Sequence, residues 1–213
     1  TLHSHLREFV DHEINHVAIE ASSHGLDQYR LDGVRLKAAA FTNLSHDHFD
    51  YHESEEDYFQ AKARLFGELL PGDGIAVLNA DCEHQGRLVE IAEARGLKVI
   101  SYGFRGWDIN IKRRRPSRDG QMLELEVFGK TCLIEMPVIG DFQAENALCA
   151  LGLVLACGAD QDAAVDALNH LHGVTGRIEK VVEHPNGAPV FVDFAHTPDA
   201  LEHVLKALKS HAR

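Results

Sequence analysis

The sequence lacks the features that mark membrane and secreted proteins. No apolar run approaches the roughly 18 residues that a membrane-spanning helix needs. The first ten residues, TLHSHLREFV, show no basic-then-apolar signal pattern. With 45% hydrophobic and 25% charged residues over 213 positions, the chain instead has the composition of a globular protein that can bury a core.

Positive charge is scarce. Lys and Arg number 21 against 33 Asp and Glu, which gives a formal net charge of −12. A field of this sign repels nucleic-acid backbones and anionic membranes, so we expect neither as a partner. An anionic substrate would have to be bound by local cations or by backbone N–H groups.

Cysteine is also sparse, and no CxxC pair occurs. All the cysteines lie in apolar or helical contexts, which predicts buried free thiols. Free thiols are typical of a reducing cytoplasm rather than of a secreted disulfide scaffold, so we expect a cytoplasmic protein. The four cysteines are Cys82, Cys132, Cys149 and Cys157.

The first half of the chain alternates apolar strands with helices, which indicates a parallel sheet covered on both faces. Ser54 and Asp57 form a capping box that opens one of the helices. The pattern predicts helices over residues 2–14, 55–70 and 83–95, and strands at HVAIEA, AAAFTNL, GIAVLNAD and LKVISYG.

After Trp107 the apolar period changes to two, which indicates an antiparallel meander exposed on one face. We therefore predict an α/β fold with a mostly parallel central sheet, flanking helices and a small antiparallel β meander. The predicted elements are strands at WDINIKRRR, QMLELEVFG and KTCLIEMPV, helices over 142–157 and 160–170, strands at RIEKVVE and PVFVDF, and a last helix from Pro198.

The final strand and helix look like the first β-α unit of a further α/β domain. A lone unit of this kind cannot bury its apolar face, so we expect the chain to be cut from something longer. We predict a central domain over residues 1–188 and the start of a second domain over 189–213.

Histidine is unusually frequent, with 15 residues, and it clusters in the loop SHDHFDYHE after the strand AAAFTNL. A loop at the carboxyl end of a parallel strand is where α/β sheets bind their ligands, so the cluster suggests a metal site. A solvated polar loop is the alternative interpretation. The cluster comprises His46, His48, Asp50 and His52, interleaved with Asp47 and Tyr51.

Lys62 lies in the middle of the apolar face of the helix predicted at 55–70. One interpretation is a lysine whose stem packs while its amine reaches water. The other is an amine of lowered pKa, which could act as a base or nucleophile or react with carbon dioxide. The carbamate formed in that last case would offer two oxygens, which suit Mg²⁺.

Candidate binding residues lie at the end of the strand HVAIEA and in the stretch that follows it. Glu20 is the only charged residue of that strand and sits at its carboxyl end, where it either faces water or ligates a metal near His48. The following stretch, SSHGLDQYR, offers Ser22, Gln28 and Arg30, whose hydroxyl, amide and guanidinium groups suit carboxylate or phosphate recognition.

Other motifs are less informative. The basic run Arg113 to Arg115 reads as a solvated hairpin face. GFRGW does not follow the strand–turn–helix order of a dinucleotide fingerprint, and no GxxxxGK[ST] phosphate loop occurs in the sequence.

Together these segments resemble the Mur ligase family. The resemblance is carried by five motifs in the family's order and spacing: EASSHGLDQYR, FTNLSHDHFDYH, YFQAKARLF, GVTGRIEKV and VDFAHTPDALE. The first two point to the branch that adds the third residue of the peptidoglycan peptide.

The resemblance implies an ATP-dependent amide-bond ligase. ATP would phosphorylate the D-glutamate carboxylate of UDP-N-acetylmuramoyl-L-alanyl-D-glutamate, and the amine of the third amino acid would attack the acyl phosphate. That amino acid is expected to be meso-2,6-diaminopimelate, with lysine as the alternative. Mg²⁺ is expected to neutralise the phosphates.

The resemblance also implies roles for individual residues. Glu20, His48 and Lys62 match residues that bind Mg²⁺, with Lys62 carbamylated and with Lys62 and His48 serving catalysis. Ser22, Gln28 and Arg30 match residues that hold the muramoyl-dipeptide. On the ATP side the matching residues are Asn146, Arg177 and Asp193, with His196 at the hinge into the next domain.

The departures from the family pattern are informative. Gln143 stands where the family usually has Asn, which puts its adenine contact in question. The phosphate loop, the uridine-binding domain and most of the amino-acid-selecting domain have no counterpart in the sequence. The chain is therefore expected to be a middle-domain fragment that is inactive alone.

Two alternatives come from other functional classes. HDHFDYH is similar to the HxHxDH signature of metallo-β-lactamase-type hydrolases, but its last histidine comes one residue too late. Tight stoichiometric Zn²⁺ would favour that hydrolase, and weak Mg²⁺ would not. The second alternative is a binding module without catalysis.

Overall fold

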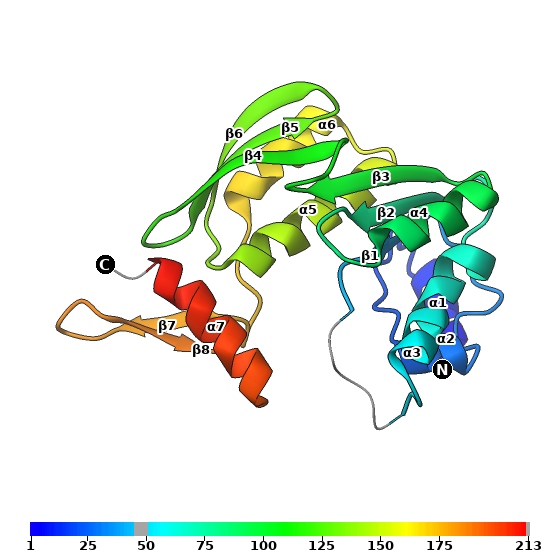
Figure 1. Ribbon diagram of the computed structural model, residues 1–213, viewed down its shortest axis with the longest axis horizontal. Helices are drawn as coiled ribbons and strands as arrows, with labels where there is room; N and C mark the ends of the chain where they lie inside the picture. The colour runs from blue at the N-terminus through cyan, green and yellow to red at the C-terminus, as the bar shows by residue number, and fades with distance from the viewer. Residues whose placement is uncertain (45–50, 212–213) are drawn as a thin grey trace.

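The computed structural model describes residues 1–44 and 51–211, apart from the side chain of Asp199. Its main body is a six-stranded sheet in the order β1-β2-β3-β4-β5-β6 (Figure 1). The strands are β1 (Ala38–Phe41), β2 (Ile75–Asn79), β3 (Lys98–Gly103), β4 (Ile109–Pro116), β5 (Gln121–Val127) and β6 (Lys130–Met136).

The predicted parallel and antiparallel regions are two halves of this one sheet. Strands β1 to β4 pair in parallel, and β4, β5 and β6 pair antiparallel. The two halves join through a short parallel pairing, Tyr102 with Ile109 and Gly103 with Asn110. The predicted α/β class with an antiparallel meander is confirmed.

Helices cover both faces of the parallel half, as the fully apolar strands predicted. In β2, Val77 faces α5 (Asp141–Ala156), whereas Ala76 and Leu78 face the side of α3 (Glu55–Arg64) and α4 (Gln85–Ala94). Gly152 lets α5 approach the sheet closely, because a Cβ there would lie 2.6 Å from the Val77 Cγ1 atom.

The helix after β1 begins as predicted. The Ser54 hydroxyl accepts a hydrogen bond from the Asp57 backbone N–H, which caps α3. The helix continues as one π-helical turn, η1 (Leu65–Leu69), so that the helical stretch matches the predicted range of 55–70.

The remaining elements lie at the two ends of the sheet. Helices α1 (Leu2–Asp11) and α2 (Ser23–Asp27) group with α3 at one end, drawn in blue to cyan in Figure 1. At the other end, β7 (Glu179–Glu183) and β8 (Pro189–Val192) form an antiparallel pair beside α7 (Pro198–His211). Between them, α6 (Gln161–Asp166) and the 3₁₀ turn η2 (Ala167–His170) pack on the β6 side.

The β7–β8 pair and α7 share a small core of their own, formed around Ile139, Ile178 and Ala207. The expected domain boundary at 188/189 falls in the turn between these two strands, and it stays a prediction. Within residues 1–44 and 51–211, no helix is both long and apolar enough to cross a membrane.

The structure corrects three expectations. HVAIEA is not a strand: residues 14–22 are irregular and Val17 is 43% exposed, because the segment pairs with no strand in the described part of the chain. Arg114 does not belong to a solvated face, since a bulge between Ile111 and Arg113 turns it inward, where it pairs with Asp141.

The third correction concerns the thiols. All four cysteines are free, as predicted, but only Cys149 is fully buried. Cys157 is exposed because it caps the carboxyl end of α5, where the helix has left the sheet.

Candidate functional site

Lys62 occupies the position on α3 that its sequence spacing predicted. Tyr58, Phe59, Leu65 and Phe66 on the same stretch of helix are all buried. The amine lies 5.3 Å from the centroid of the Tyr58 ring. Burial lowers the pKa of the Lys62 amine, and the carboxylate of Glu20 opposes that shift. The direction of this shift is the one that the lowered-pKa interpretation requires, and that interpretation stays a prediction because the Lys62 side chain is partly exposed.

Glu20 comes from the irregular segment in place of the expected strand. Its side chain is exposed, yet its charge acts on Lys62. Two of the three predicted metal-binding residues therefore influence each other electrostatically, although they are 42 positions apart and lie on different elements.

The third predicted metal ligand, His48, lies outside the described residues, as do His46, Asp47 and Asp50. His52 is described and buried, and its ring stacks on Tyr58 at a centroid distance of 5.0 Å. Among residues 1–44 and 51–211, no three His, Cys, Asp or Glu side chains converge as a metal site.

The predicted substrate-binding residues flank the short helix α2, with Ser22 before it and Gln28 and Arg30 in the turn after it. Ser22 caps α2, with its hydroxyl accepting the Gly25 N–H at 3.1 Å. The Arg30 guanidinium donates to the side-chain Oε1 atom of Gln28 at 2.5 Å, and the side-chain amide of Gln28 donates to the Tyr51 hydroxyl at 3.3 Å. Gln28 and Arg30 are therefore adjacent and exposed, while Ser22 lies at the other end of the short helix.

Arg64 holds this turn onto α3, and sequence reasoning missed it. Its guanidinium donates to the Leu26 carbonyl at 2.8 Å and to both Asp32 carboxylate oxygens at 2.9 and 2.6 Å. It also stacks over Tyr29 and pairs with Glu68. Because Arg64 is two residues from Lys62, the clamp fixes the turn relative to that lysine. No local pattern could reveal a pairing across 32 residues.

A hollow of about 240 Å³ lies at the carboxyl ends of β1 and β2, where α/β sheets bind ligands. Asp81 and His84 contribute to its lining. Nearby on α5, the pKa of Glu145 is raised by burial and by the charges of Asp81 and Asp141. These acidic groups were not singled out from the sequence, because an isolated Asp or Glu gives no signal.

The predicted ATP-side residues lie at the other end of the molecule, where α5 meets β7 and β8. Arg177 stacks on Phe194 at 5.7 Å, and its carbonyl accepts from the Gln143 amide at 3.3 Å. Asp193 accepts the Ile178 and Ala195 N–H groups at 2.8 and 2.7 Å. The structure brings Arg177 and Asp193 together.

The two other residues predicted on this side are solvent-facing. Asn146 is exposed on α5, one turn beyond Gln143. His196 is also exposed, and its Nδ1 atom lies 2.8 Å from the Phe194 carbonyl oxygen.

Comparison with known proteins identifies the family. The family model for the Mur ligase middle domain matches residues 1–154. The chain belongs to the Mur ligase family. Its Lys62 helix, its Gln28–Arg30 turn and the whole parallel half of its sheet lie inside the matched range.

Several similar relatives are longer proteins that share one name. The UDP-N-acetylmuramoyl-L-alanyl-D-glutamate--2,6-diaminopimelate ligase of Bradyrhizobium diazoefficiens is 46% identical over 216 residues, which cover 100% of this chain and 44% of the relative. The ligase of the same name from Chelativorans is 47% identical over 98% of this chain and 43% of its own length. This Mur ligase chain thus spans less than half of the curated relatives it matches.

Comparison with solved structures supports the same family assignment. A ligase structure of the same name superimposes with a TM-score of 0.78 at 36% identity, over 91% of this chain and 40% of the other. MurF from Acinetobacter baumannii has a TM-score of 0.73 at 19% identity over 84% of this chain and 38% of its own, which shows a shared fold. The hydrolase interpretation of HDHFDYH finds no support in these comparisons.

Proposed function

We propose that this chain is the middle-domain part of an ATP-dependent ligase that adds the third amino acid to UDP-N-acetylmuramoyl-L-alanyl-D-glutamate in peptidoglycan synthesis. The relatives at 46 and 47% identity carry the name of that ligase, with 2,6-diaminopimelate as the added amino acid. The observation that carries the proposal is the α3 helix, which carries the partly buried Lys62 amine within the electrostatic reach of Glu20 and, through Arg64, holds the segment that contains Gln28 and Arg30. The 213-residue chain alone is expected to be inactive.

Arg30, Gln28 and Ser22 are proposed to hold the muramoyl-dipeptide. A guanidinium has five N–H donors in a planar fork, so its bond to Gln28 leaves capacity for a substrate carboxylate. Because the chain carries a net charge of −12, a local cation is needed to bind an anionic substrate.

Glu20, Lys62 and His48 are proposed to hold Mg²⁺. The chemistry of the described pair fits that ion: Glu20 offers carboxylate oxygens, and a desolvated Lys62 amine of lowered pKa can add carbon dioxide to form a carbamate with two more. Bound there, Mg²⁺ would neutralise phosphate charge. The protein's own part is to keep the Lys62 amine partly desolvated beside Tyr58, within the electrostatic reach of the Glu20 carboxylate.

Asn146, Arg177 and Asp193 are proposed to face ATP, with Asn146 on the adenine side. The backbone N–H groups of Ile178 and Ala195 hold the Asp193 carboxylate in one orientation.

We propose a cytoplasmic location, because the four free thiols suit a reducing compartment.

The test uses steady-state kinetics on the complete gene product that contains these 213 residues. Arg30→Ala should raise KM for UDP-N-acetylmuramoyl-L-alanyl-D-glutamate roughly tenfold or more, since a charge-assisted contact contributes about 1.5–3 kcal/mol. KM for ATP should be nearly unchanged. Arg35→Ala is the matched control, because Arg35 is 83% exposed and pairs only loosely with Asp73 at 3.6 Å.

Three results would contradict the proposal. Equal effects of Arg30→Ala on both KM values would show that Arg30 is not specific to the nucleotide dipeptide. Ligation of lysine in preference to 2,6-diaminopimelate would overturn the choice of amino acid. Substrate binding without any turnover would favour the binding module.

A further inference from the structure

Four polar side chains form one continuous hydrogen-bonded chain on the turn after α2. The Arg30 guanidinium donates to the side-chain Oε1 atom of Gln28 at 2.5 Å, and the Gln28 Nε2 atom donates to the Tyr51 hydroxyl at 3.3 Å. The Tyr51 hydroxyl in turn donates to the Asp27 Oδ2 atom at 2.7 Å. Tyr51 is at least 21 positions away from the other three residues in the sequence, so this series of hydrogen bonds depends on the tertiary structure.

The groups at the two ends, the Arg30 guanidinium and the Asp27 carboxylate, determine which atoms donate and which accept along this series of hydrogen bonds. An ionised Asp27 can only accept, so the Tyr51 hydroxyl must donate to it. The hydroxyl oxygen then accepts from Gln28, which obliges the amide NH₂ to face Tyr51 and the amide oxygen to face Arg30. If the amide were reversed, two donors would meet at Arg30. Asp27 and Tyr51 therefore determine which end of the Gln28 amide meets the guanidinium.

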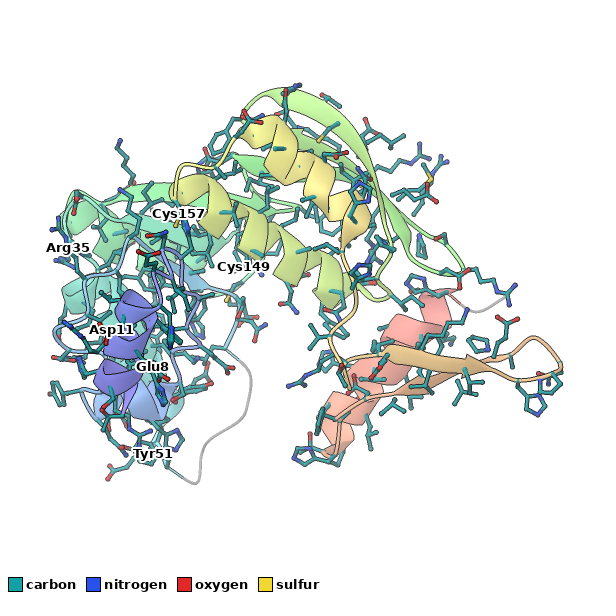
Figure 2. The ribbon with its side chains drawn as sticks, turned by 180° about the vertical axis from the view of Figure 1, so that it is seen from behind. Glu8, Asp11, Arg35, Tyr51, Cys149 and Cys157 are labelled. Carbon is teal, nitrogen blue, oxygen red and sulfur yellow. The ribbon has the colours of Figure 1, made fainter. Side chains whose placement is uncertain are left out.

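Tyr51 itself is held by its ring. The ring lies 3.9 Å from the His24 ring and 4.9 Å, edge to face, from the buried His52 ring, measured between centroids. Figure 2 shows Tyr51 at the α1–α3 end of the molecule, far from Cys149 and Cys157 of the α5 region. These ring contacts survive loss of the hydroxyl, so the hydroxyl can be tested separately.

We propose that Tyr51, with Asp27, is a positioning residue that orients Gln28 and Arg30 toward a carboxylate of the substrate. This inference rests on the proposed function, in which Gln28 and Arg30 hold the nucleotide dipeptide. With the Gln28 oxygen anchoring one N–H of Arg30, the guanidinium plane is set before the ligand arrives, which lowers the ordering cost of a bidentate contact.

The test is Tyr51→Phe in the complete gene product. Loss of one oriented hydrogen bond should raise KM for UDP-N-acetylmuramoyl-L-alanyl-D-glutamate about fivefold to tenfold. The kcat and the KM for ATP should change less than twofold, and the melting temperature should stay the same because the ring remains. Tyr29→Phe is the matched control: its ring lies under Arg64, and it also loses only a hydroxyl.

A double-mutant cycle shows whether Tyr51 acts through Gln28. If it does, Tyr51→Phe combined with Gln28→Ala should have the KM of Gln28→Ala alone. If the increases in KM caused by the two single substitutions multiply in the double variant, Tyr51 does not act through Gln28. A Tyr51→Phe enzyme with normal KM beside an impaired Arg30→Ala enzyme would sink this inference but leave the proposed function intact. Normal KM in both variants would sink both.

Discussion

Replacing Lys62 by Met should separate stability from activity. Met keeps an unbranched stem on the apolar face of α3 and removes the charged amine. Burial lowers the pKa of Lys62, so the folded protein disfavours the charged form that prevails at neutral pH. The other partner, Glu20, is exposed and stays hydrated when the amine is gone.

The stability change can be bounded from these facts. Apolar replacement of well-buried charges often stabilises by about 1–4 kcal/mol, and the partial exposure of Lys62 places this replacement at the low end. We expect a gain of about 1 kcal/mol in the free energy of unfolding, or about 2–4 °C in melting temperature for a chain of this size. Urea and thermal unfolding of the 213-residue chain measure both quantities.

The ligase activity of the Lys62→Met variant should fall, although its stability rises. Met has no amine to form a carbamate, so ligase activity of the complete gene product should fall roughly 100-fold or more, the scale seen for groups that support a bound metal. In Lys62→Ala, which leaves space, added bicarbonate or short carboxylates should restore part of the activity. Lys98→Met is the control, because Lys98 is an exposed lysine at the start of β3.

Two outcomes would refute this reasoning. Near-normal activity of Lys62→Met would mean that the amine only packs, and the carbamate proposal would be abandoned. A large loss of stability would mean that the charged amine holds α3 in place, contrary to the direction of its pKa shift.

Two further predictions concern the surface and the nucleotide. Arg87 holds the pKa of Glu56 at about 2, below its ordinary 4.5, so this pair stabilises the fold above pH 4.5 and ceases to do so as the pH falls toward 2. The stability difference between the wild-type chain and Glu56→Gln in urea unfolding should therefore shrink over that window and vanish below pH 2, and a difference that stays constant from pH 4.5 to pH 2 would contradict the assignment. Calorimetry of the 213-residue chain with Mg-ATP should show no micromolar binding, because its sequence contains no GxxxxGK[ST] loop to surround the phosphates; micromolar affinity would mean that the ATP contacts lie elsewhere.

Local rules predicted most of the elements. The Ser54 capping box opens α3 at Glu55, and period-two alternation locates β4, β5 and β6 within a few residues. The same rules were wrong for HVAIEA, because an apolar run becomes a strand only where a neighbouring strand offers backbone partners. They were also wrong for Arg114, because a bulge in β4 changes which face each later residue occupies.

The candidate site divides in the same way. Spacing alone put Lys62 on an apolar helix face, and the motifs alone singled out Glu20, Gln28 and Arg30. The sequence could not show that the Glu20 charge acts on the Lys62 amine, that Arg64 binds Leu26 and Asp32, or that Tyr51 orients Gln28.

Periodicity and capping depend on neighbours within one turn or one strand, so the sequence by itself determined most of the helices and strands and which chemical groups are present. Long-range pairing depends on how the whole chain packs. Contacts across 23 to 38 residues, such as Gln28 with Tyr51 and Leu26 with Arg64, were therefore decided only by the tertiary structure.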